Sequence, residues 1–343
     1  MNAGPLAGMR VLDLSQQLPG PYATLLLASL GAHVTKVEPV QGDAARHLDA
    51  QMFERVNAGK TSLTLNLKAA ADRERLHDLA RTSDVFVEGF RPGVAHRLGC
   101  DYETLRGLNE NIVYCSISGF GQTGPLSRQP SHDLTLQSIV GALPSDRTID
   151  RIGVPWVDLA SGTTAAFAVV AYWQAGTGTY LDIAMLDAAA AWSSVKPEAV
   201  GTPEPTYGTL ETADGKSVVI ALLEDAMWTR LCAALGWSDW SDAHGGQGLR
   251  SYVDRRAAAG PIRERLETSI RSLTLRQVVD LASEHDLPMG PVDVTSDPQT
   301  LEQLATRRAP GAPVWTGSVP LPAGHLSDLS PAPPLIDRDQ PKR

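Results

Sequence analysis

The sequence predicts an α/β fold in which a Rossmann-like large domain precedes a smaller α+β domain. Short apolar strands alternate with helical segments through the first half of the chain, which indicates a largely parallel sheet with helices on its faces. A proline-rich crossing at Pro197–Pro205 then leads to a hairpin followed by helices. We expect residues 1–195 to form the large domain, 205–295 the small domain and 296–343 a C-terminal segment.

The elements of the large domain follow from hydrophobic patterning and from the residues that interrupt it. Strands are predicted at Met9–Leu14, His33–Glu38, Thr61–Leu67, Val85–Val87, Ile112–Ile117 and Tyr180–Leu186. Helices are predicted at Tyr22–Leu30, Ala69–Thr82, Leu159–Trp173 and Asp187–Trp192. Pro19-Gly20-Pro21 is expected to break the chain before the first helix.

The second half of the chain carries a different pattern. Thr206–Leu223 is predicted to form a β-hairpin, because two apolar runs flank the turn residues Ala213-Asp214-Gly215. Helices are predicted at Ala226–Leu235, Ile262–Ser272 and Leu275–Glu284. The residues after Pro310 are rich in proline and are expected to extend over another surface.

Composition excludes several classes of protein. The 343 residues are 43% hydrophobic and 20% charged, the balance of a globular domain. A formal net charge of −9 argues against a nucleic-acid partner, which would require a basic face. The most apolar run, Ala165–Trp173, is far shorter than the roughly 20 residues of a membrane span, so no membrane partner is expected.

The cysteines indicate a reducing compartment. There are three, Cys100, Cys115 and Cys232, and none lies in a CxxC pair. Neither a disulfide framework nor a zinc site is therefore expected. Together with an N-terminus that lacks a secretory pattern, this predicts a cytoplasmic protein without a bound metal.

Two glycine-containing turns bear on ligand binding. The turn after the first strand, SQQLPGPYA, contains one glycine and lacks the G-x-G-x-x-G cradle, which argues against a nicotinamide or flavin enzyme. The glycine loop, Ser118–Pro125, follows the strand Ile112–Ile117. Such a loop would let backbone approach a ligand at the carboxyl edge of the sheet, although a flexible turn fits its spacing equally well.

Three side chains are candidates for chemistry, each with a structural alternative. Asp158 precedes a helix of small residues, where it would cap the helix or stand beside N–H donors that stabilise an oxyanion. His132 follows the glycine loop, where a structural histidine is the more common case. Glu224 follows the apolar strand Val218–Leu223 and would begin a helix or orient an imidazole. Spacing alone favours the cap for Asp158 and does not pair Glu224 with His132.

A series of motifs resembles family III CoA-transferases of the carnitine dehydratase and bile-acid-inducible F type, a group that includes the α-methylacyl-CoA racemases. The similarity covers most of residues 8–190 in order, and residues 207–215 and 287–294 more loosely. Its motifs are GMRVLDL, PGPYA, LGAHVTKVEP, GDAAR, NAGKTS, LNLK, EGFRPG, Gly119–Pro125, the Val157-Asp158 helix start and GTGTYLDIAMLD.

The resemblance implies an architecture. Family members form an interlocked homodimer of ring-shaped chains, with long linkers between the domains and a C-terminal segment that returns to the large domain. The active site lies where domains and subunits meet. Coenzyme A enters as part of an acyl-CoA substrate, and no permanently bound cofactor is expected.

The resemblance also assigns roles to residues. Asp158 matches the family's catalytic Asp, which is a nucleophile in transferases and an acid/base in racemases. His132-Asp133-Leu134 is similar to a His-Asp-Ile segment of racemases, and Glu224 resembles the Glu that pairs with that His. Many transferases also carry a run of glycines where this chain has GTPEPTYG. These features favour a racemase.

The first hypothesis is therefore a cofactor-independent epimerase of 2-methylacyl-CoA thioesters that works by 1,1-proton transfer through an enolate. His132, oriented by Glu224, would serve one face of the α-carbon and Asp158 the other. N–H groups at the start of the Leu159 helix would hold the enolate oxygen.

Contacts to coenzyme A are expected from four residues. Arg91 and Arg46 are predicted to bind its phosphates, with Lys36 a further candidate and Gly121 in the glycine loop. Two alternatives to the racemase stay open. One is a family III CoA-transferase that moves CoA between carboxylic acids with Asp158 as nucleophile. The other is a non-catalytic CoA-binding partner subunit.

Overall fold

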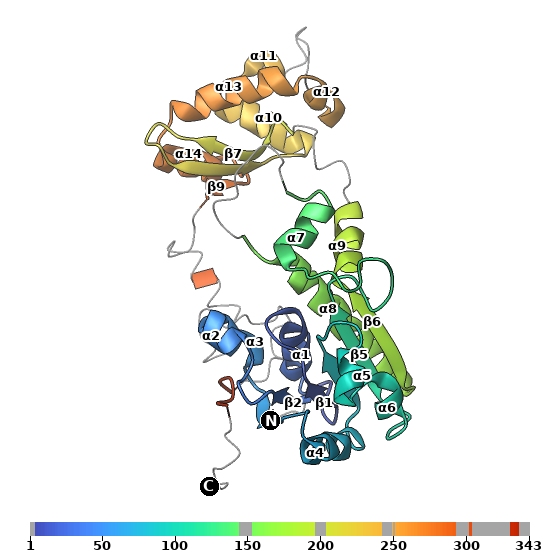
Figure 1. Cartoon of the computed structure of the whole chain (residues 1–343). Helices are drawn as coiled ribbons and strands as arrows, with labels where there is room; N and C mark the ends of the chain where they lie inside the picture. Colours follow the sequence, from blue (N-terminus) through green and yellow to red (C-terminus); the bar gives the residue numbers. More distant parts are fainter. Residues whose placement is uncertain are drawn as a thin grey trace. The chain divides into compact units, whose positions relative to one another are not determined.

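A computed structural model of the chain describes residues 4–143, 153–195, 204–241, 249, 251–292, 302–303 and 330–335. The chain divides into two units (Figure 1). Unit 1 comprises residues 1–200 and 307–343, and unit 2 comprises residues 201–306. The division falls inside the Pro197–Pro205 crossing, most of which lies outside the described residues.

Unit 1 is built on a six-stranded sheet in the order β3-β2-β1-β4-β5-β6. All neighbouring strands run parallel. The strands are β1 (Arg10–Asp13), β2 (His33–Glu38), β3 (Thr61–Thr64), β4 (Val85–Glu88), β5 (Val113–Ser118) and β6 (Thr179–Ala184). The chain moves outward from β1 to β3 and then returns to place β4 on the other side of β1. The carboxyl ends of β1 and β4 therefore form a topological switch point, where such sheets bind ligands. The α/β prediction is confirmed.

Helices cover both faces of this sheet. Strand residues alternate between two cores, so that Val11 packs in one and Leu12 in the other. The first core includes residues of α1 (Pro19–Ser29), α7 (Asp133–Ile139), α8 (Trp156–Ala175) and α9 (Met185–Ser194). The second core includes residues of α4 (Ala70–Ala80) and α6 (Tyr102–Arg106). Short helices α2 (Ala45–Leu48), α3 (Ala50–Asn57) and α5 (Val94–Leu98) complete the described part of the unit.

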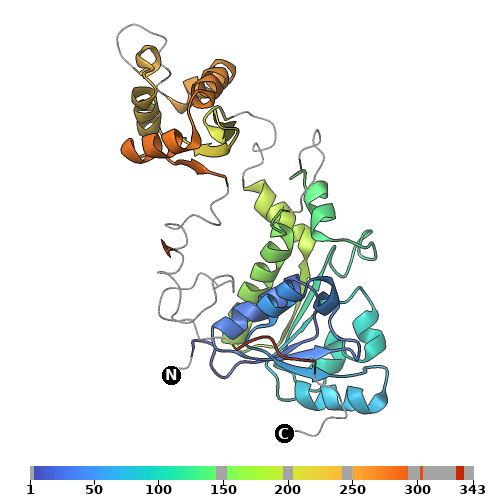
Figure 2. The same cartoon turned by 90° about the vertical axis from the view of Figure 1, so that its left-hand side faces the viewer.

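Helix α1 begins earlier than predicted and packs closely on α8. It starts at Pro19 rather than Tyr22, because proline in the first turn needs no N–H partner and already has a helical φ. The two helices lie side by side (Figure 1, Figure 2). A Cβ atom at Gly162 of α8 would come within 2.6 Å of the Pro19 carbonyl oxygen, so only glycine permits this approach.

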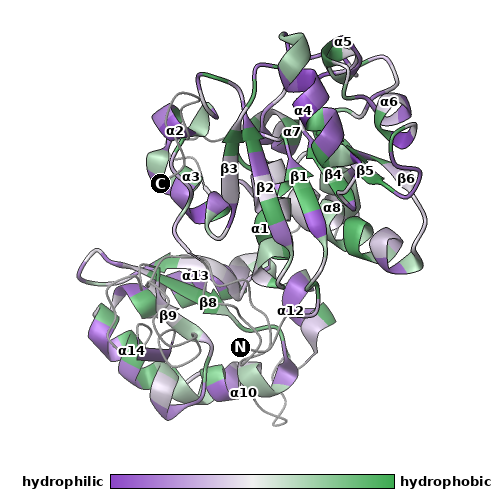
Figure 3. Cartoon of the chain, turned by 90° about the horizontal axis from the view of Figure 1, so that it is seen from below, coloured by the Kyte–Doolittle hydropathy of each residue, from purple (hydrophilic) through white to green (hydrophobic). Residues whose placement is uncertain are grey.

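Unit 2 has the α+β character that the sequence predicts. Strands β7 (Tyr207–Glu211) and β8 (Ser217–Ala221) form the expected antiparallel hairpin, and β9 (Met289–Pro291) pairs with β8. The strand β8 is strongly hydrophobic (Figure 3). The sheet packs with the described helices α10 (Asp225–Ala234), α11 (Ser238–Ser241), α12 (Tyr252–Ala257), α13 (Ala259–Arg271) and α14 (Leu275–Glu284).

Part of the C-terminal segment lies against unit 1. The Ser330 carbonyl accepts the Gly59 N–H at 2.6 Å, and the Pro333 carbonyl accepts the Arg46 guanidinium at 2.9 Å. Most of residues 296–343 lie outside the described residues, and the interlocked ring stays a prediction. In the ranges that the structure describes, no helix is long and apolar enough to cross a membrane.

Candidate active site

Asp158 lies inside the first turn of α8 rather than before it. The helix begins at Trp156, three residues earlier than an Asp158 cap would require. The first N–H groups of α8 already have acceptors, so the expectation that they hold an enolate oxygen is wrong. The bonds are Trp156 N to Val154 O at 2.8 Å, Val157 N to Asp133 Oδ1 at 2.8 Å, Asp158 N to Asp133 Oδ1 at 3.2 Å and Leu159 N to Pro155 O at 3.1 Å.

Asp133 supplies the cap that local spacing assigned to Asp158. It begins α7, is 8% exposed, and its carboxylate also accepts a hydrogen bond from the Gln137 amide. One carboxylate oxygen thus ties the start of α7 to the first turn of α8. Sequence reasoning gave Asp133 no role of its own, although it is the second residue of the His132-Asp133-Leu134 motif.

The environment of Asp158 changes its acidity. Burial, with the nearby Asp133 carboxylate adding to it, raises the pKa of Asp158 from 3.8 to about 7. No cation is among the causes of this shift. A carboxyl of this kind is a stronger base and nucleophile than an exposed one, and it is present in both protonation states near neutrality.

The packing of α8 on α1 orients Asp158. Gly162 lies one turn after Asp158 on the same side of α8, and this side meets the start of α1 at Pro19 and Tyr22. Because side chains tilt toward the N-terminus of their helix, Asp158 faces the region just before α1. That region is the turn that leaves β1 at the switch point.

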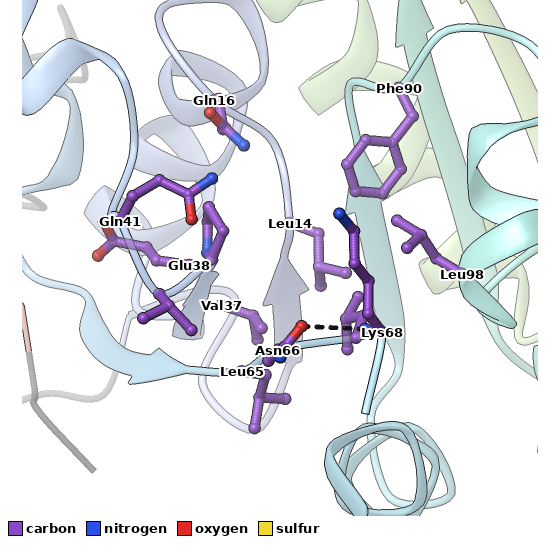
Figure 4. Close-up of a pocket in the computed structure, with 13 residues that line it drawn as sticks. Leu14, Gln16, Val37, Glu38, Gln41, Leu65, Asn66, Lys68, Phe90 and Leu98 are labelled. Atoms are coloured by element: carbon purple, nitrogen blue, oxygen red, sulfur yellow. Dashed lines mark hydrogen bonds between the residues drawn. The ribbon is translucent and has the colours of Figure 1, made fainter. Parts of the chain in front are cut away.

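A cavity of about 520 Å³ opens at the carboxyl ends of β1, β2, β3 and β4 (Figure 4). Its size falls within the range of sites for small molecules and cofactors. The wall is mainly apolar, with a few polar side chains. The lining residues are Leu14, Gln16, Val37, Glu38, Pro39, Val40, Gln41, Leu65, Asn66, Leu67, Lys68, Phe90 and Leu98.

Lys68 is a basic residue of this cavity. It belongs to the LNLK motif but was not predicted to contact coenzyme A. Its side chain extends along the cavity between Leu14 and Phe90 (Figure 4). The predicted strand Thr61–Leu67 ends early, at Thr64, so that residues 65–68 leave the sheet and form one wall. A basic residue directly after a strand at the carboxyl edge is the signal that would have indicated it.

The predicted phosphate contacts have different surroundings. Arg91 is exposed and directly follows Phe90 of the cavity wall. Lys36 is fully buried, with its ammonium nitrogen 2.9 Å from the Asp43 carboxylate and 2.9 Å from the Ser15 carbonyl oxygen. This pairing gives Lys36 a structural role instead of a contact to a phosphate.

Arg46 is also engaged within the protein. Its guanidinium forms two hydrogen bonds to the Glu38 carboxylate, at 2.8 and 2.7 Å, and lies 4.0 Å from the centre of the Phe53 ring. Gly121 is buried with a φ of 78°, and a Cβ there would be 3.4 Å from the Asp182 carboxylate. Arg46 therefore supports the cavity wall, and the positive φ of Gly121 favours glycine at that position.

His132 and Glu224 belong to different units. His132 is exposed at the start of α7, next to Asp133, so it lies near the α8 start in unit 1. Glu224 is exposed at the start of α10 in unit 2. Their pairing stays a prediction. Across the described part of the chain, no three His, Cys, Asp or Glu side chains are grouped as metal ligands.

A cavity of this size at the switch point of a parallel sheet is typical of α/β proteins that bind a small molecule or cofactor. The chain belongs to CoA-transferase family III, whose family model matches residues 6–341. The resemblance seen in the sequence is confirmed, and with it the prediction of an enzyme in the transferase or racemase group.

Known proteins similar to the chain cover most of its length. An acetyl-CoA:oxalate CoA-transferase of Acetobacter aceti is 32% identical, covering 89% of this chain and 85% of its own. A succinyl-CoA:mesaconate CoA-transferase of Haloarcula marismortui is 35% identical, covering 90% and 87%. The crystal structure of a CAIB/BAIF family protein from Brucella suis superposes with a TM-score of 0.78 at 26% identity, over 97% of each chain.

Proposed function

We propose that this protein is a CoA-transferase that moves coenzyme A from an acyl-CoA to a small dicarboxylic acid through Asp158. The single observation that carries the proposal is the half-buried carboxyl of Asp158, with its raised pKa, in a family III chain. The named relatives are CoA-transferases, which favours transfer over the racemase reaction expected first. Two of them are named for oxalate and mesaconate, which motivates the dicarboxylic acceptor.

The reaction would proceed through covalent intermediates on Asp158. Its carboxylate attacks the thioester carbonyl and the C–S bond breaks. The CoA thiolate is the leaving group, and an acyl-aspartyl anhydride forms on Asp158. The thiolate then attacks the Asp158 carbonyl, which releases the donor acid and leaves an aspartyl-CoA thioester. The acceptor carboxylate then attacks the aspartyl-CoA thioester, which releases the CoA thiolate and forms a second anhydride. The thiolate attacks the acceptor's carbonyl in this anhydride, which gives the new acyl-CoA and restores the Asp158 carboxylate. No proton is consumed, so the reaction needs Asp158 ionised at its start.

Coenzyme A would bind with its nucleotide in the cavity at the switch point. The apolar wall suits the adenine ring, and the Lys68 ammonium in the lining would contact a phosphate. Arg91, exposed beside Phe90, would contact another. Three of the predicted contacts would not touch coenzyme A but would stabilise the cavity wall and the glycine loop: Lys36, Arg46 and Gly121.

We also propose that the working form is a cytoplasmic homodimer. Unit 1 exposes large apolar side chains on neighbouring helices: Phe167 of α8 at 77%, and Trp192 of α9 at 52%. A second copy of the chain would bury them. The three cysteines are all unpaired thiols, as a reducing compartment requires.

One observation keeps the racemase as a second candidate. A carboxyl whose pKa is about 7 can both remove and return a proton near neutral pH. His132 directly precedes Asp133, whose carboxylate accepts the Asp158 N–H. The racemase would act on 2-methylacyl-CoA without an acceptor acid.

The two reactions are separated by one pair of assays. The protein is incubated with acetyl-CoA or succinyl-CoA and isotope-labelled oxalate or mesaconate, and the new thioester is measured by mass spectrometry. Hydroxylamine should trap an acyl adduct at Asp158 during turnover. A parallel incubation with 2-methylacyl-CoA in D₂O should show no α-hydrogen exchange. Exchange without acceptor, together with no thioester transfer and no trapped adduct, would assign the racemase reaction instead.

A further inference from the structure

A buried carboxyl ends β4, next to β1 at the switch point, and the proposed reaction does not use it. Glu88 is only 2% exposed. Its carboxylate accepts the Phe90 N–H at 2.5 Å. Burial raises the pKa of Glu88 to about 7, against the lowering effect of hydrogen bonds from Ser116 and Phe90. Burying a carboxyl costs free energy, and hydrogen bonds to neighbouring groups offset that cost.

The contacts of Glu88 continue across the sheet. Glu88 on β4 is in register with Ser116 on β5, and Ser116 is in register with Asp182 on β6. The Ser116 hydroxyl bonds to Glu88 and also accepts the Gln122 side-chain amide at 2.8 Å. The Gln122 backbone N–H donates to the Asp182 carboxylate at 3.0 Å. These four side chains form one polar row at the carboxyl ends of three strands.

The row joins two segments that border the ligand site. At one end, Phe90 lines the cavity at the switch point. At the other end, Gln122 belongs to the glycine loop, 118–125, whose Gly121 packs on Asp182. Glu88 therefore fixes the backbone of the cavity wall directly, and through Ser116 it fixes a loop that follows the neighbouring strand.

We propose that Glu88 is a positioning residue for coenzyme A, which holds the Phe90 wall and the glycine loop in the conformation that binds the nucleotide. This inference rests on the proposed function, because it takes coenzyme A as the ligand of the cavity. Glu88 does not touch the reacting atoms, which lie at Asp158 on α8. Its loss should therefore weaken CoA binding and leave the chemical step largely intact.

Two substitutions at Glu88 are expected to have different effects on the binding of coenzyme A. Glu88→Ala leaves the Phe90 N–H and the Ser116 hydroxyl without their acceptor, so both segments lose their fixed positions. Glu88→Gln keeps one carbonyl acceptor of the same shape and resembles the protonated carboxyl. The conservative variant should therefore rescue most of the function that the alanine variant loses.

A matched control lies immediately before the same strand. Asp84, just before β4, accepts the Arg10 backbone N–H at 2.7 Å at the opposite, amino edge of the sheet. Asp84→Asn changes the same kind of bond without reaching the cavity or the glycine loop.

The test is calorimetric titration of the full chain with free coenzyme A. Glu88→Ala should raise the dissociation constant at least about tenfold, the size expected for a lost hydrogen bond to a charged group. Glu88→Gln and Asp84→Asn should stay within about threefold of the parent protein. Mere destabilisation would lower the number of binding sites and the melting temperature without changing the dissociation constant.

The outcomes separate this inference from the proposed function. If the parent protein binds coenzyme A and Glu88→Ala binds it equally well, the positioning role is overturned and the transferase proposal stands. If coenzyme A binding depends on Glu88 but no acyl transfer is found, the positioning role stands and the proposed reaction fails. If Glu88→Ala does not fold, Gln122→Ala replaces it, with at least about threefold weaker binding expected and unchanged binding overturning the role.

Discussion

Asp13, which is buried, and Asp158, which is half-buried, are two carboxyls in unit 1 whose surroundings shift their pKa values in opposite directions. Asp13, at the end of β1, is fully buried, which would raise its pKa, but Lys60 and Lys36 outweigh burial and hold the pKa far below its usual range. The Lys60 ammonium is 3.0 Å away, and the Ser15 and Thr24 hydroxyls add hydrogen bonds. Among the described residues, no cation contributes to the pKa shift of Asp158, and burial together with the Asp133 carboxylate raises its pKa to about 7.

The difference shows how neighbouring charges suit one carboxyl to a structural role and leave the other available for a reaction. A buried carboxylate that is paired and hydrogen-bonded is chemically inert and holds β1 to the segment before β3. A desolvated carboxyl beside another carboxylate has a higher energy when ionised, which makes it a stronger base and nucleophile. The two residues are both aspartates of unit 1, so the charged groups beside them and their degree of burial give the opposite pKa shifts.

The largest effect is expected from Asp158→Asn. Without the nucleophile, kcat for acyl transfer should fall by about a thousandfold or more, and the hydroxylamine-trapped adduct should disappear. The folded pKa of Asp158 lies above its unfolded value, so its stability contribution is full at low pH and is lost as pH rises toward 7. The variant should therefore gain in melting temperature relative to the parent between pH 4 and 8, measured by calorimetry. Unchanged turnover would remove Asp158 from the mechanism.

The next effect concerns stability. Lys60→Met leaves Asp13 with one fewer cation, and the unpaired buried charge should lower the free energy of unfolding by about 3 kcal/mol in urea denaturation. Arg75→Ala, which removes an exposed cation from α4, is the matched control and should change stability by less than about 0.5 kcal/mol. Equal stability of both variants would mean that the Asp13–Lys60 pair is not part of the stabilising core.

A smaller effect is expected from Lys68→Ala. Loss of one phosphate contact should raise KM for acyl-CoA about tenfold with kcat nearly unchanged, and KM for the acceptor acid should not change. Lys68→Arg should recover most of the affinity. If kcat falls and KM does not, Lys68 acts in catalysis and the cavity is not the nucleotide site.

The smallest effect is a shift in a pH profile. Asp133→Asn keeps an oxygen to accept the Val157 and Asp158 N–H groups but removes the charge that raises the pKa of Asp158. The acid limb of kcat/KM against pH should therefore move to lower pH, because Asp158 ionises more easily. A shift in the opposite direction would show that Asp133 does not act on Asp158 by charge.

The sequence predicted the positions of the strands of the large domain well because each strand of the sheet is a local apolar pattern. The strand at His33–Glu38 and the helix at Leu275–Glu284 match the structure residue for residue. Local information was sufficient for these elements. Asp158 and Glu224 were noticed at the ends of apolar runs, but their predicted roles came from the resemblance to family III CoA-transferases.

Other parts depend on contacts that no local pattern reveals. Asp133 caps a helix that begins more than twenty residues later, so spacing around Asp158 assigned the cap to the wrong residue. Lys36 was predicted as a further candidate for a phosphate contact, and its partner Asp43 comes from a later turn, so no local pattern indicated the buried ion pair. The cavity itself forms from segments after four strands, and its lining emerges only when the sheet assembles.

Gly162 carries a consequence for how the active site can be damaged. The space between α1 and α8 has no room for a methyl group there, since the nearest atom is rigid backbone at Pro19. An alanine at 162 would wedge the two helices apart one turn below Asp158, and tightly packed interiors transmit such a displacement. The carboxyl that we propose as the nucleophile would then be displaced, and catalysis depends steeply on such alignment. A substitution at Gly162 would thus lower the rate of the proposed reaction through packing alone.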